Sequence, residues 1–266
     1  MPSDLNTDPA RFGELGYCLF RDVLSAEETV RLGAMLDEAL ADPLPPPAGR
    51  NGSMDRGNYV GEPHVRDLRW LDLCRHPRVL DAIESILGPN LILVYSSVFI
   101  KPPGSPLKVG WHQDNTYWPS VHGTDVITLW LAVDDADAAN SAMKVIPGSH
   151  RGWKELETVD SGADQMLHRS VPVSRELEES AVTLEMSAGS LSIHDSFILH
   201  GSDENRSGGR RAGYTIRYCS TDTAWVDLDV HPHPVFLVRG QAGPRGDRYT
   251  CLLPGVEAAM ELLRKP

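Results

Sequence analysis

Residues 189–200 read Gly-Ser-Leu-Ser-Ile-His-Asp-Ser-Phe-Ile-Leu-His, and this stretch decides the predicted fold. With the two-residue period of a β-strand, mostly small and polar side chains alternate with apolar ones. One face then carries Ser192, His194, Ser196, Ile198 and His200, and the other carries Leu191, Ile193, Phe197 and Leu199. We therefore expect a strand that packs its apolar face in a core and lines a cavity with the other.

Short apolar runs of this kind recur through the rest of the chain. They cover residues 91–101, 107–112, 125–133, 143–146, 182–186, 189–200 and 211–219. Gly, Pro, Asn or Asp separates most of them, which is typical of strands joined by turns. The pattern predicts a β-rich core over about residues 91–250, folded as a barrel or a sandwich.

The N-terminal part of the chain follows a helical pattern instead. Ser25 and Glu28 have the spacing of a capping box, and apolar residues then recur at helical spacing. A second amphipathic helix is expected over residues 79–87. We expect one domain over residues 1–266, in which a helical layer at about 1–90 packs on the β core.

Two long stretches lack a clear period. Residues 44–65 are rich in Pro, Gly and Asn, and residues 151–180 are polar and irregular. Long loops in compact domains are often lids or binding segments, so we expect both to close over a site. A last helix, at about residues 256–263, is expected to serve as a packing element.

Composition and charge exclude several classes of protein. Of the 266 residues, 41% are apolar and 23% charged, and no run reaches the roughly 20 apolar residues of a membrane span. The formal charge of −12 disfavours nucleic acids and anionic membranes as partners. Scattered cysteines, no secretory signal and no peroxisomal address predict free thiols in a cytoplasmic protein. The sequence carries no signature of an oligomeric state.

The sequence Trp111-His112-Gln113-Asp114 ends one of the apolar runs. Alternate residues of a strand point to the same side, so His112 and Asp114 offer an imidazole and a carboxylate together. With His200 they form the two-His, one-carboxylate set that binds Fe(II) in non-haem oxygenases and leaves coordination positions open. The same donors also suit the zinc ion of a hydrolase, which stays the alternative at this point.

Arg211 follows His200 by eleven residues, across a loop with the composition of a hairpin. The strand expected there places on one side Arg211, Gly213, Thr215 and Arg217. A 2-oxo acid can fill two metal positions and O2 the third, and a guanidinium binds the far carboxylate of 2-oxoglutarate bidentately. A zinc hydrolase has no use for Arg211, so the oxygenase is favoured.

Five motifs carry a resemblance to a known family: Phe99-Ile-Lys-Pro-Pro-Gly, Trp111-His-Gln-Asp, Leu129-Trp-Leu-Ala-Val, Val145-Ile-Pro-Gly-Ser-His and His200-Gly-Ser-Asp-Glu-Asn-Arg-Ser-Gly-Gly-Arg-Arg. In their order and spacing, from about Phe12 to about Tyr249, the chain resembles the phytanoyl-CoA dioxygenase (PhyH) family of Fe(II)- and 2-oxoglutarate-dependent oxygenases. The resemblance implies a mainly β fold with flanking helices and a double-stranded β-helix core, the jelly roll of cupin-like proteins.

The resemblance also assigns the metal centre by position. It implies that the iron ligands are His112, Asp114 and His200. Arg211 matches the residue that holds the distal carboxylate of 2-oxoglutarate, with Arg210 as the adjacent alternative. Related halogenases have Ala or Gly at the position of Asp114, so the resemblance disfavours halogenation.

Further side chains are assigned around this centre. Those expected to contact the cosubstrate are Lys101, Trp130 and Ser202. Those expected in the substrate pocket are Tyr117, Trp118 and His194. His231 and His233 are separated by one Pro, but no third ligand is evident near them, so we do not expect a second metal site there.

The expected activity follows from the resemblance. It is the hydroxylation of a small metabolite or natural-product intermediate, with Fe(II) as cofactor, 2-oxoglutarate and O2 as cosubstrates, and release of succinate and CO2. Phytanoyl-CoA itself is disfavoured, because a chain of net charge −12 is a poor general partner for the polyanionic CoA group. Epoxidation, desaturation and ring formation stay open, as does a catalytically silent or zinc-binding jelly-roll protein of the same family.

Overall fold

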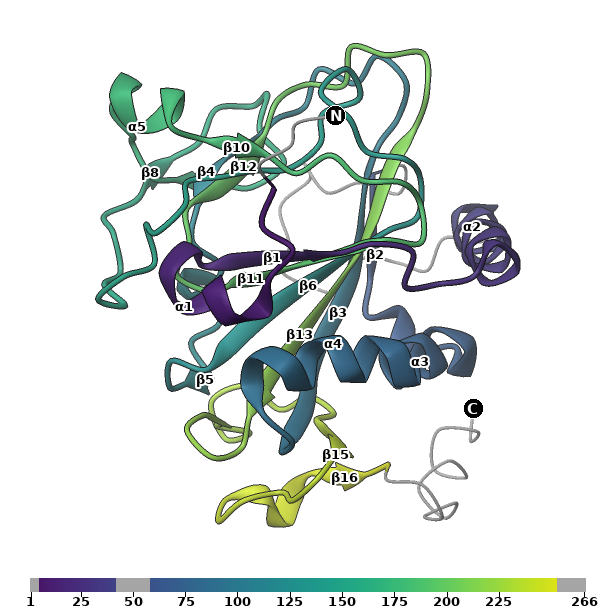
Figure 1. Cartoon of the computed structure of the whole chain (residues 1–266), viewed down its shortest axis with the longest axis vertical. Helices are drawn as coiled ribbons and strands as arrows, with labels where there is room; N and C mark the ends of the chain where they lie inside the picture. The colour runs from purple at the N-terminus through teal and green to yellow at the C-terminus, as the bar shows by residue number, and fades with distance from the viewer. Residues whose placement is uncertain (1–4, 42–57, 253–266) are drawn as a thin grey trace.

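The computed structural model of the chain describes residues 5–41 and 58–252 (Figure 1). Its centre is a long antiparallel pair of strands, β3 (Leu91–Lys101) and β13 (Arg211–Ser220). Every residue of β13 is buried, because one face of this strand packs on helices and the other lines a cavity. The predicted run at residues 91–101 matches β3, but two strands of the sheet that contains β3 come from the N-terminal part of the chain, where a helical layer was expected.

The remaining strands are short. They are β1 (Tyr17–Phe20), β2 (Tyr59–Gly61), β4 (Val109–His112), β5 (Val121–His122), β6 (Val126–Ala132), β7 (Lys144–Val145), β8 (Val159–Asp160), β9 (Arg169–Ser170), β10 (Val182–Thr183), β11 (Leu191–Asp195), β12 (His200–Ser202), β14 (Trp225–Val226), β15 (Phe236–Arg239) and β16 (Thr250–Cys251). The helices are α1 (Phe12–Leu15), α2 (Ala26–Ala41), α3 (Leu68–Cys74), α4 (Pro77–Leu87), α5 (Arg175–Glu179) and the 3-10 turns η1 (Pro9–Arg11), η2 (Pro63–Val65), η3 (Asp114–Tyr117) and η4 (Gly246–Arg248).

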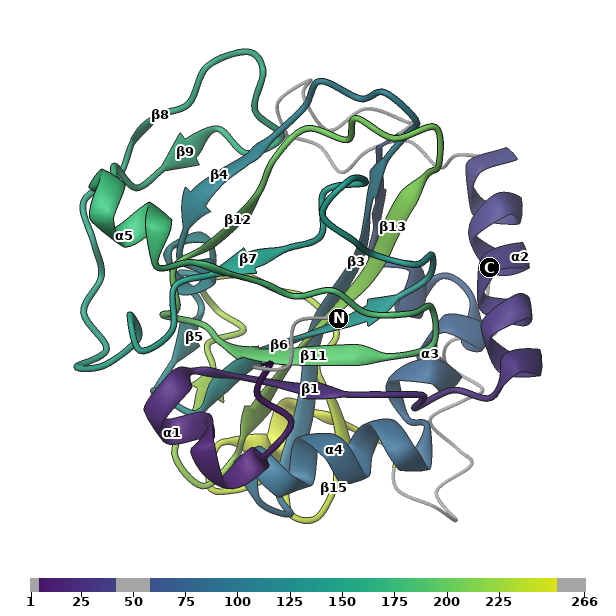
Figure 2. The same ribbon diagram turned by 45° about the horizontal axis from the view of Figure 1, so that its top comes forward.

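Two sheets form the β core. The larger has the strand order β1-β11-β6-β13-β3-β15-β16 with β2 beside β3, and the smaller has the order β10-β7-β12-β4. In Figure 2, β4, β12 and β7 lie side by side above β6, β11 and β1. Trp130 of the larger sheet packs with Val145 of the smaller in one apolar cluster between them. The predicted mainly β fold with a jelly-roll core is confirmed.

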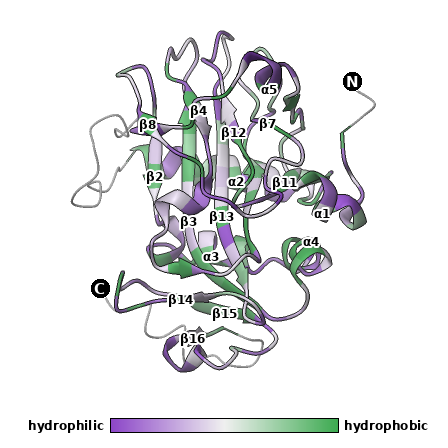
Figure 3. Cartoon of the chain, turned by 90° about the vertical axis from the view of Figure 1, so that its left-hand side faces the viewer, coloured by the Kyte–Doolittle hydropathy of each residue, from purple (hydrophilic) through white to green (hydrophobic). Residues whose placement is uncertain are grey.

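Helices α2, α3 and α4 cover the outer face of the larger sheet (Figure 1). Leu36, Trp70 and Ile83 from these helices bury their side chains in one cluster with Tyr214 and Ile216 of β13. Burial of each such side chain contributes about 1.5–3 kcal/mol. In Figure 3, α4 carries both hydrophobic (green) and hydrophilic (purple) residues, and its buried side chains include Val79 and Ile83. No helix of the described residues is long and apolar enough to cross a lipid bilayer.

The predicted capping box starts α2. The Ser25 amide donates to Glu28 Oε2 at 2.8 Å, and the Glu28 amide donates to Ser25 Oγ at 3.3 Å. The two bonds satisfy donors that the first helical turn leaves unpaired. The second predicted helix is confirmed as α4, which begins two residues earlier than expected, at Pro77.

The prediction of a single strand through residues 189–200 is wrong. Strand β11 ends at Asp195, the chain turns, and His200 begins β12 in the other sheet. The turn forms because Asp195 Oδ1 accepts a hydrogen bond from the Phe197 amide at 2.8 Å, which reverses the backbone locally. Ile198, expected on the polar face, instead packs in the core between the sheets.

The predicted lids have different outcomes. Most of residues 44–65 lies outside the described residues, and its last part forms β2 and η2. Residues 151–180 contain the short β8–β9 hairpin and α5, and the rest of the segment is irregular, as predicted. The amide of Val171 donates to the Trp111 carbonyl at 2.6 Å, so the segment lies along β4. The helix predicted at residues 256–263 lies outside the described residues.

Candidate metal centre and cavity

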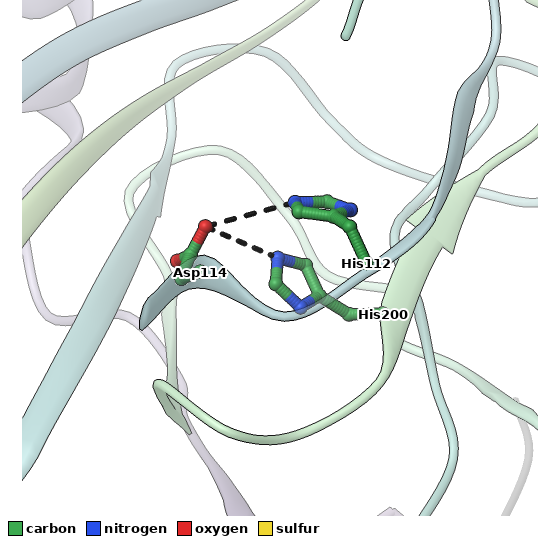
Figure 4. Close-up of side chains that lie close together, drawn as sticks. All are labelled: His112, Asp114 and His200. Carbon is green, nitrogen blue, oxygen red and sulfur yellow. Dashed lines mark ion pairs between the residues drawn. The ribbon is translucent and has the colours of Figure 1, made fainter. Parts of the chain in front are cut away.

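Three predicted ligands converge at one point between the sheets (Figure 4). Asp114 Oδ1 lies 3.6 Å from His112 Nε2 and 3.7 Å from His200 Nε2. All three side chains are buried, and their donor atoms lie within 4.8 Å of one another. One expectation about their placement is wrong, because Asp114 begins the η3 turn rather than continuing the strand that ends at His112.

Backbone carbonyls fix the orientation of both imidazoles. The Nδ1–H of His112 donates to the Gly110 carbonyl at 2.9 Å, and that of His200 donates to the Ile198 carbonyl at 3.0 Å. Each bond uses Nδ1, so the lone pair of Nε2 faces Asp114 and the centre. Hydrogen bonds of this kind hold a histidine in the tautomer and ring orientation that a metal requires.

The second carboxylate oxygen of Asp114 is held from the larger sheet. Thr128 of β6 donates its hydroxyl to Asp114 Oδ2, and His194 Nε2 of β11 lies 3.4 Å from the same oxygen. His194 is 1% exposed and lines the cavity, as predicted, but it lies behind the carboxylate. It is not part of the three-residue donor group.

The charges of this cluster favour metal binding. Burial raises the pKa of Asp114, but the neighbouring imidazoles and the Arg217 guanidinium outweigh it, and this pKa lies well below its ordinary value. Burial, reinforced by repulsion from His112 and His194, lowers the pKa of His200 well below its ordinary value. At neutral pH the carboxylate is therefore ionised and His200 is neutral, the forms in which these residues bind a metal.

Arg211 lies in the same cavity, on β13. Its Nε and Nη2 both donate to the Ser141 carbonyl, at 2.8 and 2.6 Å, and its guanidinium lies 5.3 Å from the centre of the Trp130 ring. The side chain is 3% exposed, and burial lowers its pKa to about 10. The predicted alternative, Arg210, points away and forms ion pairs with Asp134 and Asp37 at 2.8 and 2.6 Å.

Lys101 lies beside this arginine but does not line the cavity. Its ammonium donates to Ser141 Oγ at 2.9 Å, to Ser202 Oγ at 2.7 Å and to the Asp203 carbonyl. Burial and repulsion from Arg211 lower the pKa of Lys101 below its ordinary value, and the oxygen atoms around the ammonium oppose this shift. Of the residues predicted to contact the cosubstrate, Trp130 and Ser202 line the cavity, and Lys101 holds the segment after His200 in place.

The cavity measures about 530 Å³, within the usual size range of small-ligand pockets. Both Tyr117 and Trp118 line it, as predicted for the substrate pocket. Tyr117 donates its hydroxyl to the Arg169 carbonyl at 2.9 Å, and burial together with Asp114 raises its pKa to about 12. Tyr117 thereby links the turn that follows the metal ligands to β9.

Sequence reasoning missed several residues of the cavity wall. His231 and His233, which were set aside as a metal pair, line the cavity with ring centres 5.1 Å apart and without a third ligand in the described residues. Met166 and His168 of the predicted lid also line it. Arg217 does so too, and the alternation along its strand was the available signal.

Comparisons with known proteins agree with the motifs. The sequence profile described as phytanoyl-CoA dioxygenase (PhyH) matches residues 12–213. The peroxisomal phytanoyl-CoA dioxygenase of Bos taurus is 25% identical over 162 residues, which are 59% of this chain and 48% of that protein. This chain therefore spans about half the length of that relative.

Two further proteins extend the comparison. A probable alpha-ketoglutarate-dependent hypophosphite dioxygenase of Stutzerimonas stutzeri is 32% identical over 178 residues, 62% of this chain and 58% of that protein. The solved structure of the non-heme monooxygenase ThoJ in its apo form shares the fold, with a TM-score of 0.74 at 24% identity over 96% of this chain and 92% of that one. Because the family profile covers most of the chain, the protein belongs to the phytanoyl-CoA dioxygenase (PhyH) family.

Proposed function

We propose that this protein is an Fe(II)- and 2-oxoglutarate-dependent dioxygenase that hydroxylates a small organic molecule. The observation that carries the proposal is one buried group of two imidazoles and one carboxylate, set in a cavity that also holds a buried arginine. A donor set of this kind leaves coordination positions open for a cosubstrate and O2. Zinc-dependent hydrolysis would use the same donors but would leave Arg211 without a role.

The donor set fits Fe(II) in charge and in geometry. His112, Asp114 and His200 would hold the ion through Nε2, Oδ1 and Nε2, and the donor atoms of these residues already lie within 4.8 Å of one another. Thr128 would keep the Asp114 carboxylate in its orientation through its hydrogen bond to Oδ2. Bound Fe(II) would supply O2 activation coupled to the decarboxylation of 2-oxoglutarate to succinate and CO2.

Arg211 fits the distal carboxylate of 2-oxoglutarate. No carboxylate of the described residues pairs with this guanidinium, although a buried charge without a counter-ion is costly. Its orientation is fixed by the Ser141 carbonyl and by Trp130. We therefore assign Arg211 to bind the cosubstrate, with Trp130 as an apolar wall and Lys101 as a residue that positions Ser141 and Ser202.

The cavity supports a small-molecule substrate. Its aromatic and apolar wall, with Tyr117 and Trp118 next to the ligands, would exclude water around the reacting centre. The cysteines of the described residues are free, which agrees with a reducing compartment and supports a cytoplasmic location. The identity of the atom that is oxidised depends on how the substrate lies against these two side chains.

Turnover of 2-oxoglutarate tests the proposal. Protein purified without oxygen is incubated with Fe(II), 2-oxoglutarate, O2 and a metabolite extract, and mass spectrometry measures succinate and products heavier by one oxygen atom. We expect both products from the wild type and neither from Asp114→Ala or Arg211→Gln. Arg210→Gln is the matched control, because its side chain points away from the cavity and should leave turnover intact.

Two outcomes would contradict the proposal. One is substrate-dependent succinate formation that persists in Asp114→Ala, because the three-donor centre would then be unnecessary. The other is a protein that binds zinc stoichiometrically, ignores 2-oxoglutarate and hydrolyses a component of the extract.

A further inference from the structure

The cavity contains a second buried arginine that the proposed reaction does not use. Arg217 lies six residues after Arg211 on β13, and both line the cavity. A strand rises by about 3.4 Å per residue, so their Cα atoms lie about 20 Å apart. Arg217 is paired in register with Thr128, which donates to the metal ligand Asp114. Along β13, Arg217 is therefore level with Thr128, whereas Arg211 lies at the start of the strand.

The hydrogen bonds of Arg217 leave one edge of its guanidinium available. Nη1 donates to Ser97 Oγ at 2.9 Å, to Thr215 Oγ1 at 2.5 Å and to the Thr215 carbonyl at 3.3 Å. Nε is buried and has no hydrogen-bond partner in the part of the chain that the structure describes. The Nε–Nη2 edge is one that binds a carboxylate through two parallel hydrogen bonds.

Aromatic rings hold the guanidinium in place. Its carbon lies 5.5 Å from the centre of the Trp118 ring and 5.8 Å from that of Tyr95. At these distances the rings attract the guanidinium through cation–π contacts. Together with the hydrogen bonds of Nη1, these contacts restrict the side chain before a ligand arrives, which reduces the entropy lost on binding.

No carboxylate of the described residues forms an ion pair with Arg217. The two buried arginines of the described residues are Arg211 and Arg217, and neither forms an ion pair with a described carboxylate. Asp114 is close enough to feel this charge, but it is engaged with His112, His194, His200 and Thr128. A buried guanidinium with an unpaired N–H is costly, and an anion entering the cavity would relieve that cost.

We propose that Arg217 determines substrate specificity by binding a carboxylate of the substrate through its Nε–Nη2 edge. The proposal rests on the proposed function, because it treats Arg211 as the cosubstrate arginine and so leaves Arg217 for the substrate. The apolar part of the substrate would lie along the aromatic wall near Trp118 and Tyr95. The substrate class is therefore a small organic acid with an apolar body.

Matched acids and amides test this assignment. Protein loaded with Zn(II) and saturated with 2-oxoglutarate under nitrogen is titrated calorimetrically with phenylacetate, 3-phenylpropionate and 4-phenylbutyrate, and with the carboxamide of each. The ion is redox-inert, so binding is measured without turnover. We expect at least one acid to bind about tenfold more tightly than its amide, because the amide lacks the charge and one acceptor oxygen.

Variants at position 217 identify the residue that gives the preference. Arg217→Gln should bind acid and amide equally, and Arg217→Lys should keep a smaller preference because it keeps the charge and loses the planar fork. Arg210→Gln, the matched surface control, should keep the full preference. Thermal unfolding and the affinity for 2-oxoglutarate show whether each variant is folded. If Arg217→Gln does not fold, Arg217→Lys provides the test.

The outcomes separate this inference from the proposed function. Failure of the wild type to bind 2-oxoglutarate would contradict the proposed function. If the wild type binds 2-oxoglutarate normally but binds no acid more tightly than its amide, the assignment of Arg217 is overturned and the proposed function is not affected. A preference for the acid that survives unchanged in folded Arg217→Gln or Arg217→Lys would overturn it as well.

Discussion

Gly213→Ala is predicted to destabilise the protein and to weaken the binding of 2-oxoglutarate. A Cβ atom on Gly213 would lie 2.0 Å from Trp130 Cε2 and 2.4 Å from Trp130 Nε1, far closer than two such atoms can approach. Trp130 is 4% exposed and packs between the two sheets, so its ring has little room to move. Any movement of this ring disturbs the guanidinium of Arg211, 5.3 Å from its centre.

The expected magnitude follows from the cost of overpacking a core. Forcing a methyl group into a well-packed site costs about 1–3 kcal/mol of the free energy of unfolding. For a chain of this size the midpoint of thermal unfolding should then fall by roughly 2–12 °C. Gly33→Ala is the matched control, because Gly33 lies in α2 with open space around its Cβ position, and alanine there should stabilise the helix by about 0.5–1 kcal/mol.

Two assays on the same samples measure this effect. Circular dichroism gives the unfolding midpoint, and calorimetric titration of the Mn(II)-loaded protein under nitrogen gives the affinity for 2-oxoglutarate. We expect the affinity of Gly213→Ala for 2-oxoglutarate to fall about tenfold or more, which is about 1.4 kcal/mol. The affinity for Mn(II) alone should stay unchanged, because the metal ligands lie on β4, η3 and β12 rather than on β13.

A double-mutant cycle tests the cause. In a Trp130→Leu background the indole is gone, so Gly213→Ala should cost less than about 0.5 kcal/mol. An equal loss of stability in both backgrounds would refute the steric reasoning, as would a Gly213→Ala variant as stable as Gly33→Ala.

Three further predictions concern residues around the site. Thr128→Val removes a hydrogen bond to Asp114, so metal affinity measured by competitive titration should fall about 10–100-fold in a folded protein; an unchanged affinity would contradict this role. Lys101→Met removes the donor that Ser141, Ser202 and the Asp203 carbonyl share, and should lower the free energy of unfolding in denaturant by about 2–4 kcal/mol. An unchanged free energy of unfolding would show that these oxygens find other donors. Burial raises the pKa of Asp195 to about 7, so between about pH 4 and 7 the folded protein keeps a proton that the unfolded chain has lost. The free energy of unfolding should therefore fall as pH rises through this range, by at most about 4 kcal/mol. The same pH series with Asp195→Asn should lack this fall.

The features that local sequence predicted are those that depend on periodicity and on short motifs. The face of β13 that carries Arg211 and Arg217 follows directly from strand alternation, and Tyr214 packs against the helices on the opposite face. The capping box at Ser25 is equally local. The convergence of the three metal ligands needed the order of the motifs as well, because strand periodicity relates His112 to Asp114 but not to His200.

The features that sequence did not predict depend on tertiary contacts. A two-residue period continues through residues 191–200, yet the Asp195 side chain ends the strand by bonding the Phe197 amide. Alternation alone cannot distinguish a straight strand from two strands in facing sheets. Similarly, His231 and His233 reach the cavity through a Pro-rich segment without a period, so no local pattern predicts their position.

The central claim is that His112, Asp114 and His200 together hold one Fe(II) ion. The most direct test is a crystal structure of the protein prepared with Fe(II) and 2-oxoglutarate under nitrogen, in which anomalous scattering locates the iron. We predict a single peak bonded to Nε2 of both histidines and to one oxygen of Asp114, with 2-oxoglutarate chelating the ion and reaching Arg211. Iron bound elsewhere, or a centre closed by His194 as a fourth protein ligand, would contradict the account.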